Sequence, residues 1–148
     1  KLFNIIRPDR AFFGLKDYQQ YLLIKQLVRD LAFEIEIIGI EIERESDGLA
    51  VSSRNAYLTA EEREIAPFLY ACLNDVATAI LNNDRDYRRL EKEGLQKLQE
   101  AGFHPDYFSI CHAETLQSAN AKDDSIVLLA AVTLGSCRLI DNLRIKIA

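Results

Sequence analysis

The chain has 148 residues, of which 49% are hydrophobic, and this is enough apolar material to build a core. Its 18 basic and 23 acidic side chains give a formal net charge of −5, which argues against a general nucleic-acid-binding surface and leaves room only for a local basic site. The longest apolar run, residues 125–132, is much shorter than a membrane-spanning helix, so we expect neither a membrane segment nor a signal peptide.

Residues 1–7 are predicted to form the end of a helix, because Pro8 disfavours helical backbone at the residue before it. A second helix is predicted over residues 17–31. In that segment Leu23, Leu27 and Leu31 recur at helical spacing, with Ile24 and Val28 beside them, which predicts a stripe facing the core.

This second helix is flanked by two predicted strands. Residues 10–13 form a short apolar segment that runs into Gly14, and residues 33–42 alternate polar and apolar side chains. A strand, a helix and a second strand over about thirty residues are typical of a parallel β-α-β crossover. We therefore expect residues 1–43 to be the last part of a doubly wound, Rossmann-like nucleotide-binding domain.

Polar side chains follow the first of these strands. Lys16 and Asp17 are predicted at the carboxyl end of that strand, where open α/β sheets bind ligands. Lys16 is suited to a phosphate, and Asp17 to a ribose hydroxyl or to the cap of the following helix. Gln20, in the first turn of that helix, offers a donor and an acceptor to a hydroxy acid, although a solvated glutamine is common at such a position.

A polar loop over residues 47–55 joins the two regions of the chain. Gly48 provides backbone freedom, and Ser52, Ser53 and Arg54 provide two hydroxyls and a permanently charged guanidinium, a set that suits phosphate oxygens. By residue type alone, an ordinary loop leading into a helix is the simpler interpretation.

The second region, residues 44–148, is predicted to be a compact α+β lid. One helix is expected from a capping box at Thr59 to about residue 82, and a second from about Asp86 to Gly102, a typical αL stop. Three strands are then expected to form a small antiparallel sheet packed on these helices, over residues 106–112, 125–132 and 136–147.

The remaining cysteine, histidine and basic residues are best explained without a metal or redox site. Cys72, Cys111 and Cys137 are widely separated and are expected to be buried and reduced, which fits a cytoplasmic protein. His104 and His112 have no neighbours at zinc-ligand spacing and are expected to be structural or solvent-facing. Acidic residues interleave with a basic helical face, which is therefore expected to be a solvated surface; its members are Arg85, Arg88, Arg89 and Lys92.

Two long strings give the chain a resemblance to a known family. Asp47-Gly-Leu-Ala-Val-Ser-Ser-Arg-Asn-Ala-Tyr-Leu58 resembles the signature of pantothenate synthetases (pantoate–β-alanine ligases), in which the Ser-Ser-Arg element corresponds to the mobile nucleotide-binding loop of class I aminoacyl-tRNA synthetases. Lys1-Leu-Phe-Asn4 and Pro8-Asp-Arg-Ala-Phe-Phe-Gly-Leu-Lys-Asp-Tyr-Gln-Gln20 also match. The resemblance is clear over residues 1–58 and weaker beyond, and it implies the C-terminal portion of such an enzyme.

The resemblance implies an ATP-dependent ligase that condenses pantoate with β-alanine through pantoyl adenylate, giving pantothenate, AMP and pyrophosphate. It implies Mg²⁺ on the triphosphate, a cytoplasmic homodimer, and no nucleic-acid or membrane partner. Position by position, it implies catalytic roles for Lys16, Ser52, Ser53 and Arg54, and pantoate binding by Gln20. It implies ATP binding by Gly14, Leu15, Lys16, Asp17, Glu43, Val51, Ser52, Ser53 and Arg54.

The chain also departs from the family pattern. Leu15 stands where the family usually has glutamate, and Glu43 where it usually has an aliphatic residue that touches adenine through its backbone. The family's His-x-Gly-His element has no counterpart in these 148 residues, which also lack methionine. We therefore expect a piece of a longer protein that is catalytically incompetent by itself.

Two other functions compete with this interpretation. One is a different adenylyl-transferring enzyme of the same superfamily, against which the Tyr18-Gln19-Gln20 run argues. The other is a non-catalytic interaction module whose helices and sheet serve assembly alone.

Overall fold

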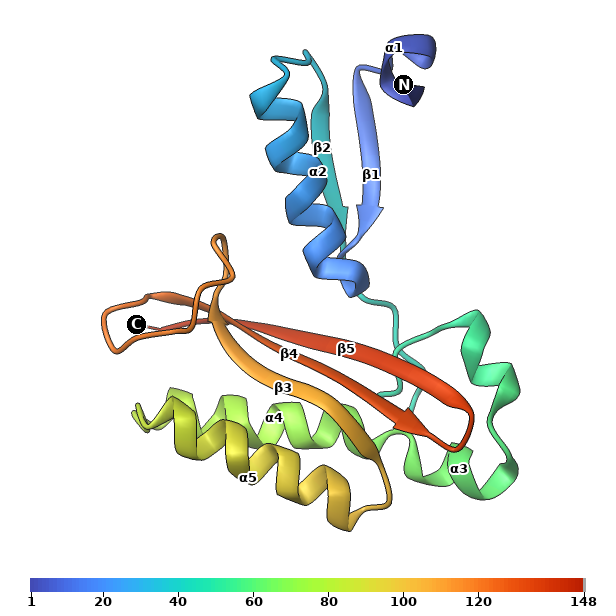
Figure 1. The fold of residues 1–148 in the computed structure, drawn as a ribbon, viewed down its shortest axis with the longest axis vertical. Coiled ribbons are helices and arrows are strands. Elements are labelled where there is room, and N and C mark those ends of the chain that lie inside the picture. The colour runs from blue at the N-terminus through green and yellow to red at the C-terminus, as the bar shows by residue number, and fades with distance from the viewer. Residues whose placement is uncertain (148) are drawn as a thin grey trace. The chain divides into compact units, whose positions relative to one another are not determined.

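The computed structural model describes residues 1–147, which form two compact units that divide between Ile42 and Glu43 (Figure 1). The fold is mixed α/β. The first unit contains a parallel sheet of two strands, and the second an antiparallel sheet of three strands. We describe each unit separately.

The first unit is a β-α-β crossover preceded by a short helix. Helix α1 (Leu2–Ile6) ends at Arg7, which takes the left-handed conformation just before Pro8. Strands β1 (Arg10–Gly14) and β2 (Glu36–Ile40) pair in parallel, and helix α2 (Tyr18–Asp30) connects them. The predicted order of elements in this region is therefore confirmed.

The predicted core-facing stripe on α2 is covered only in part within residues 1–147. Val28 is buried and Ile24 is half-buried, whereas Leu23 and Leu31 are 66% and 61% exposed. Helical periodicity identifies an apolar face but does not establish that another element covers it. Phe12 and Ile40, in the two strands, are also largely exposed, so this unit presents apolar side chains from both its helix and its sheet.

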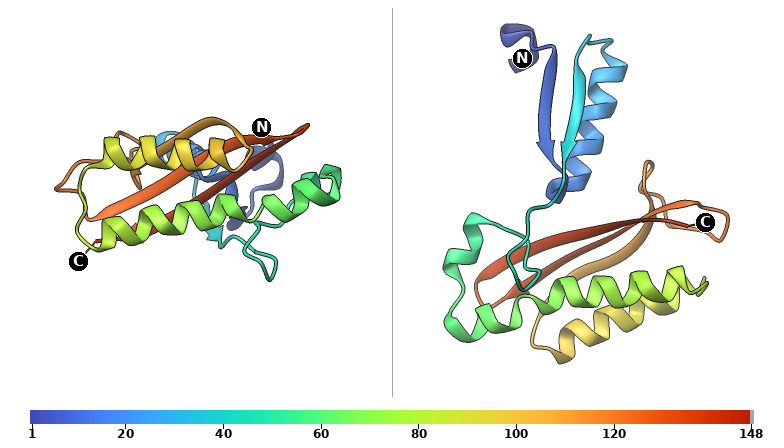
Figure 2. Two further views of the ribbon diagram at one scale, coloured as in Figure 1. Left: turned by 90° about the horizontal axis from the view of Figure 1, so that it is seen from below. Right: turned by 180° about the vertical axis from the view of Figure 1, so that it is seen from behind.

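The second unit packs two helices on one face of its sheet, as the views in Figures 1 and 2 agree. Helices α4 (Phe68–Leu81) and α5 (Tyr87–Glu100) lie against strands β3 (His104–His112), β4 (Ser125–Leu134) and β5 (Cys137–Lys146). Strand β4 is central and pairs in antiparallel fashion with both neighbours. The predicted sheet is confirmed.

The predicted starts and stops of the helices are confirmed with one correction. Thr59 and Glu62 form a reciprocal capping box at the start of α3 (Ala60–Ile65), and Asp86 accepts the Arg89 amide at the start of α5. The single helix predicted over residues 59–82 is wrong, because a turn at Pro67 separates α3 from α4. Proline has no N–H to donate, and its ring clashes with the carbonyl four residues before it.

Residues Ala60–Leu81 are apolar and long enough to cross a membrane by length and composition. Six residues of α4 are nevertheless buried in the core of the second unit, where they meet the helix-facing side chains of β4. We therefore interpret α4 as a core helix. All three cysteines are buried and free, as predicted.

Candidate functional site

The first group of predicted site residues lies where β1 ends. A 3-10 turn over Leu15–Asp17 follows the strand directly and leads into α2, so the predicted strand, turn and helix are present. Lys16 is half-buried, while Asp17 and Gln20 are exposed at this end of the unit. The turn thus presents a charged and polar set at the carboxyl end of a parallel strand.

Gly14 and Leu15 have different structural roles in this turn. Gly14 has φ of −67°, which any residue adopts, and a Cβ there would meet no atom within 4 Å. The Leu15 side chain is 3% exposed and packs on Gly39, where a Cβ would lie 2.6 Å from Leu15 Cδ2. Leu15 is therefore a core residue of this unit, so only its backbone is available to a ligand.

Asp17 occupies the N-cap position of α2 without capping it. Its side chain accepts no hydrogen bond from the helix, and within residues 1–147 its carboxylate has no other partner. Helix capping, the structural alternative for this residue, is therefore not what the side chain does here. The exposed carboxylate remains available as a hydrogen-bond acceptor.

The second group begins with a small hairpin over residues 43–51. The Val51 amide donates to the Glu43 carbonyl at 2.9 Å, and the Glu45 amide donates to the Leu49 carbonyl at 2.9 Å. Gly48 makes the turn with φ of +94°, a conformation that side-chain-bearing residues rarely adopt. The Glu43 carbonyl is therefore already engaged by Val51, although its second lone pair is open to another donor.

The Ser-Ser-Arg loop, residues 52–54, follows this hairpin and opens a 3-10 helix over Ser53–Tyr57. The Ser52 hydroxyl caps this turn by accepting the Arg54 amide at 3.2 Å. Cys137 at the start of β5 donates its S–H to the Arg54 carbonyl, with a sulfur-oxygen distance of 3.2 Å. The backbone of the loop is thus fixed to the sheet of the second unit.

The side chains of the same loop are open. Ser53 and Arg54 are exposed, and within residues 1–147 neither the hydroxyl nor the guanidinium has a hydrogen-bond or ion-pair partner. A fixed backbone that presents a free hydroxyl and a free guanidinium is an arrangement that can bind an anion without prior rearrangement.

Three residues that support this loop are missing from the sequence-based site. Arg44 forms an ion pair with the buried Asp141 of β5, and Arg63 of α3 forms ion pairs with Glu45 and Asp47 of the hairpin. These ion pairs engage Asp141, Glu45 and Asp47, whereas the Arg54 guanidinium has no acidic partner within residues 1–147. No sequence pattern indicates these pairs, since their partners lie 16, 18 and 97 residues apart.

Asn55 is the third supporting residue. Its amide nitrogen donates to the Ala50 carbonyl at 3.2 Å and to Glu45 Oε1 at 3.4 Å, which ties the 3-10 helix back to the hairpin. Its position directly after the Ser-Ser-Arg element was the one signal available in the sequence. The Asn55 side-chain oxygen is buried and accepts no hydrogen bond from residues 1–147.

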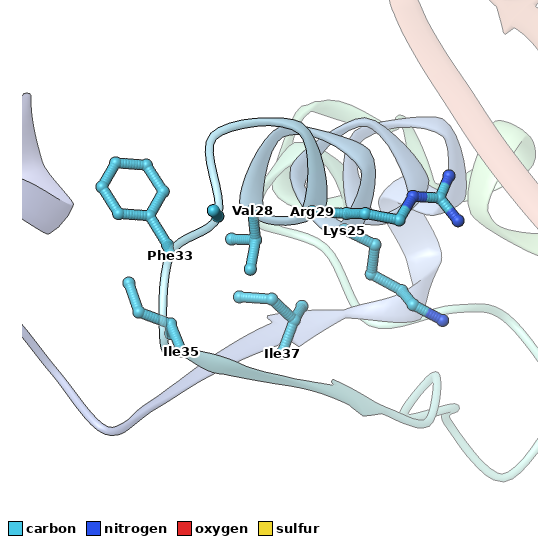
Figure 3. Close-up of a pocket in the computed structure, with 7 residues that line it drawn as sticks. Lys25, Val28, Arg29, Phe33, Ile35 and Ile37 are labelled. Carbon is cyan, nitrogen blue, oxygen red and sulfur yellow. The ribbon is translucent and has the colours of Figure 1, made fainter.

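A hollow on the first unit lies away from these residues. Val28 of α2 points toward Ile37 of β2 in this hollow, and Lys25 and Arg29 extend along one side (Figure 3). The hollow is formed by the last turns of α2 and the start of β2. Gly14, by contrast, ends β1, and Lys16 lies just before the start of α2. The hollow is therefore separate from the strand-end turn.

The histidines have no metal-binding arrangement. His112 Nδ1 accepts the amides of Glu114 and Thr115 at 3.2 and 3.3 Å, so it stabilises a turn, and His104 is exposed. Within residues 1–147 no three His, Cys, Asp or Glu side chains are grouped so that they could hold a metal ion.

Comparison with known proteins gives one consistent result. Residues 1–144 match the family described as Pantoate-beta-alanine ligase. A pantothenate synthetase of Alkalilimnicola ehrlichii is 50% identical over 147 residues, covering 99% of this chain and 51% of that protein. A pantothenate synthetase of Azotobacter vinelandii is 51% identical over 148 residues, covering 100% of this chain and 52% of that protein. The chain spans about half the length of the curated relatives it matches.

Solved structures agree with the sequence match. Pantothenate synthetase from Thermus thermophilus is 39% identical with a TM-score of 0.89, over 96% of this chain and 51% of that one. Pantoate-beta-alanine ligase from Francisella tularensis, complexed with beta-gamma ATP and beta-alanine, is 33% identical with a TM-score of 0.69. The match covers 96% of this chain and 46% of that one.

Proposed function

Because the chain belongs to the pantoate-beta-alanine ligase family, we propose that it supplies the triphosphate-binding portion of an ATP-dependent ligase that joins pantoate to β-alanine. The observation that supports this most directly is the Ser-Ser-Arg loop, whose backbone is fixed while Ser53 and Arg54 present free side chains. The ATP and beta-alanine in the Francisella tularensis structure are consistent with these substrates.

We assign the two units different parts of this enzyme. The first is the last β-α-β part of a Rossmann-like domain, and the second is a lid that carries the loop. Parallel sheets of this kind are covered on both faces, and the exposed Phe12, Leu23 and Ile40 fit a unit that packs against further polypeptide. We propose that this polypeptide is the half of the relatives that the match leaves out, and that the present chain is the C-terminal portion.

The proposed reaction has two steps. A carboxylate oxygen of pantoate attacks the α-phosphorus of ATP, the bond to the β-phosphate breaks, and pyrophosphate leaves. The amine of β-alanine then attacks the acyl carbon of pantoyl adenylate, which releases AMP and a proton and forms the amide bond. Neither step needs a covalent enzyme intermediate, so catalysis depends on alignment and on stabilising the charge that accumulates on pyrophosphate.

The residues of this chain supply that stabilisation in the proposal. Arg54 meets the leaving pyrophosphate, with Ser52 and Ser53 donating hydrogen bonds and Lys16 adding a second positive charge. Asp17 accepts from the ribose, Gln20 binds pantoate, and Glu43 meets adenine through its backbone. The backbone of Val51, Gly14 and Leu15 completes the nucleotide contacts.

Magnesium enters this proposal as part of the substrate. No protein cluster suited to a divalent ion occurs within residues 1–147, and Mg²⁺ commonly keeps its waters and is held by substrate phosphates. The residues present therefore fit an ion carried by the triphosphate, where it would neutralise phosphate charge. We further propose that the complete enzyme is a cytoplasmic homodimer.

The test compares the 148-residue chain with a completed chain, in which these residues follow the unmatched half of the Alkalilimnicola ehrlichii relative. AMP release that requires both pantoate and β-alanine is expected from the completed chain and not from the 148 residues alone. Turnover by the 148 residues alone would overturn the predicted incompetence.

Arg54 provides the sharper test in the completed chain. Arg54→Ala is expected to lower the rate of AMP release about 100-fold, because it removes the main charge at the leaving group. Arg89→Ala is the matched control, since that arginine forms an exposed ion pair with Glu93 within α5. An Arg54→Ala variant as active as the control would contradict the proposed function.

A further inference from the structure

The Arg44 side chain forms an ion pair with Asp141, and both side chains are largely buried. Its side chain is 17% exposed and that of Asp141 only 3%, and the two meet through two parallel hydrogen bonds. Arg44 Nη1 lies 2.7 Å from Asp141 Oδ2, and Arg44 Nη2 lies 2.9 Å from Asp141 Oδ1. This bidentate geometry fixes the plane of the guanidinium as well as its position.

Further contacts join the same guanidinium to the hairpin and to a helix. Nη1 donates to the Gly48 carbonyl at 3.1 Å, and Nη2 donates to the Asn142 carbonyl at 3.3 Å. The guanidinium carbon lies 3.6 Å from the centre of the Tyr70 ring of α4, a stacked arrangement. Arg44 thus connects the hairpin turn, β5 and α4 at one point.

This point lies close to the Ser-Ser-Arg loop along the backbone. Arg44 pairs with Ala50 across the hairpin, and the next pair, Glu43 with Val51, leads directly into Ser52. Asn55 holds the far side of the loop to Ala50. The position of Arg44 therefore sets the position from which the loop departs.

Arg44 is unsuited to binding phosphate itself. An arginine has five N–H donors, and four of those on Arg44 are engaged by Asp141, Gly48 and Asn142. Its aromatic contact occupies one face of the guanidinium as well. By contrast, the guanidinium of Arg54 is exposed and open.

We propose that Arg44 is a positioning residue for the Ser-Ser-Arg loop, acting through the hairpin to hold Arg54 where the leaving pyrophosphate forms. This inference rests on the proposed function, because that function supplies the role of Arg54. Lysine at position 44 keeps the positive charge but lacks the paired N–H donors and the planar face of a guanidinium. Arg44→Lys is therefore expected to loosen the hairpin. Arg63 does not contact Arg44, so its ion pairs with Glu45 and Asp47 remain available in that variant.

The first test measures amide hydrogen exchange by NMR on the 148-residue chain. In Arg44→Lys, exchange at Val51 and Asn55 is expected to accelerate about tenfold, with the β4 amides of Leu128 and Ala130 within about twofold of the parent chain. Tyr70→Leu, which removes the stack and keeps the ion pair, is expected to act in the same direction. Arg89→Lys, at an exposed ion pair with Glu93 within α5, is the control and should change none of these amides.

Two results of this test would overturn the inference. One is unchanged exchange at Val51 and Asn55 in Arg44→Lys. The other is acceleration of the β4 amides by the same factor as the loop, which would make Arg44 a general contributor to stability.

The second test is a double-mutant cycle on AMP release by the completed chain. Arg44→Lys is expected to lower kcat about tenfold with an unchanged KM for β-alanine, and to have no further effect once Arg54→Ala is present. If Arg54→Ala alone has no effect, the proposed function fails. If Arg54→Ala is damaging and the two effects multiply, the proposed function stands and the positioning role is wrong.

Discussion

The ring of Tyr70 leaves no room for a Cβ at Gly48: a Cβ built there would lie 2.7 Å from Tyr70 Cδ1. Gly48 also has φ of +94°, so a side chain meets both backbone strain and a steric clash. We predict that Gly48→Ala lowers the free energy of unfolding by about 1–3 kcal/mol, measured by urea denaturation.

Two other glycines distinguish the effect of backbone strain from that of the steric clash with Tyr70. Gly102 has φ of +96° with no atom within 4 Å of its Cβ position, so Gly102→Ala reports backbone strain alone. Gly14 has an ordinary φ and the same empty surroundings, so Gly14→Ala should be neutral in stability. A Gly48→Ala variant no less stable than Gly102→Ala would show that Tyr70 moves aside without cost.

The capping box at Thr59 stabilises the helix that carries Arg63. The Thr59 hydroxyl accepts the Glu62 amide at 3.2 Å, and Glu62 Oε2 accepts the Thr59 amide at 2.9 Å. Thr59→Ala is predicted to cost about 1 kcal/mol of unfolding free energy, measured by urea denaturation. Thr59→Ser keeps the hydroxyl and is expected to retain most of this stability; equal losses in both variants would exclude the cap as the cause.

The stabilisation that Asp47 contributes to the hairpin is predicted to depend on pH in the acid range. A hydrogen bond from Arg63, followed by one from the Leu49 amide, holds the pKa of Asp47 below its usual value. Because the folded-state pKa is the lower one, the stabilisation is present above the unfolded value of about 3.9 and is lost as pH falls through the folded pKa.

An NMR titration of the side-chain carboxyl carbons measures this effect. Asp47 is predicted to titrate below about pH 3.9 in the parent chain and to return toward that ordinary value in Arg63→Gln. The control is Arg138→Gln, which leaves both Asp47 hydrogen bonds in place. A titration of Asp47 that is identical in the parent and Arg63→Gln chains would refute the assigned cause.

Cys72 is predicted to resist thiol reagents. Burial raises the pKa of the Cys72 thiol to about 11, and burial also raises the pKa of Cys111. Because the thiolate is the reactive form, Cys72 should react with Ellman's reagent at about pH 8 far more slowly in the folded chain than in urea. Mass mapping of the labelled peptides identifies the site; rapid labelling of Cys72 in the folded chain would contradict its burial.

Local sequence chemistry predicted most of the element boundaries in this chain. The Thr59 capping box, the Asp86 cap and the αL residue Gly102 each act within a few neighbouring residues, and each lies where it was expected. The continuous helix over residues 59–82 was wrong although Pro67 was visible, since helical periodicity continues on both sides of that turn.

The unpredicted features depend on contacts between distant parts of the chain. Nothing near Arg44 in the sequence indicates Asp141 as its partner or Tyr70 as its stacking surface. The predicted stripe of α2 is buried at Val28 but exposed at Leu23 and Leu31 for a related reason, because spacing identifies an apolar face but not the element that covers it. The Ser-Ser-Arg loop was identified by resemblance, and residue types alone indicated only a polar loop.

The separation of Arg44 from Asp141 by 97 residues also sets an order of events during synthesis. At translation rates of about 5–20 residues per second, Arg44 is made about 5–20 seconds before its partner. During that interval the hairpin has no strand to hold it, even if α3 has formed. The hairpin from which the Ser-Ser-Arg loop departs is therefore held by Asp141 only after the last strand has joined the sheet.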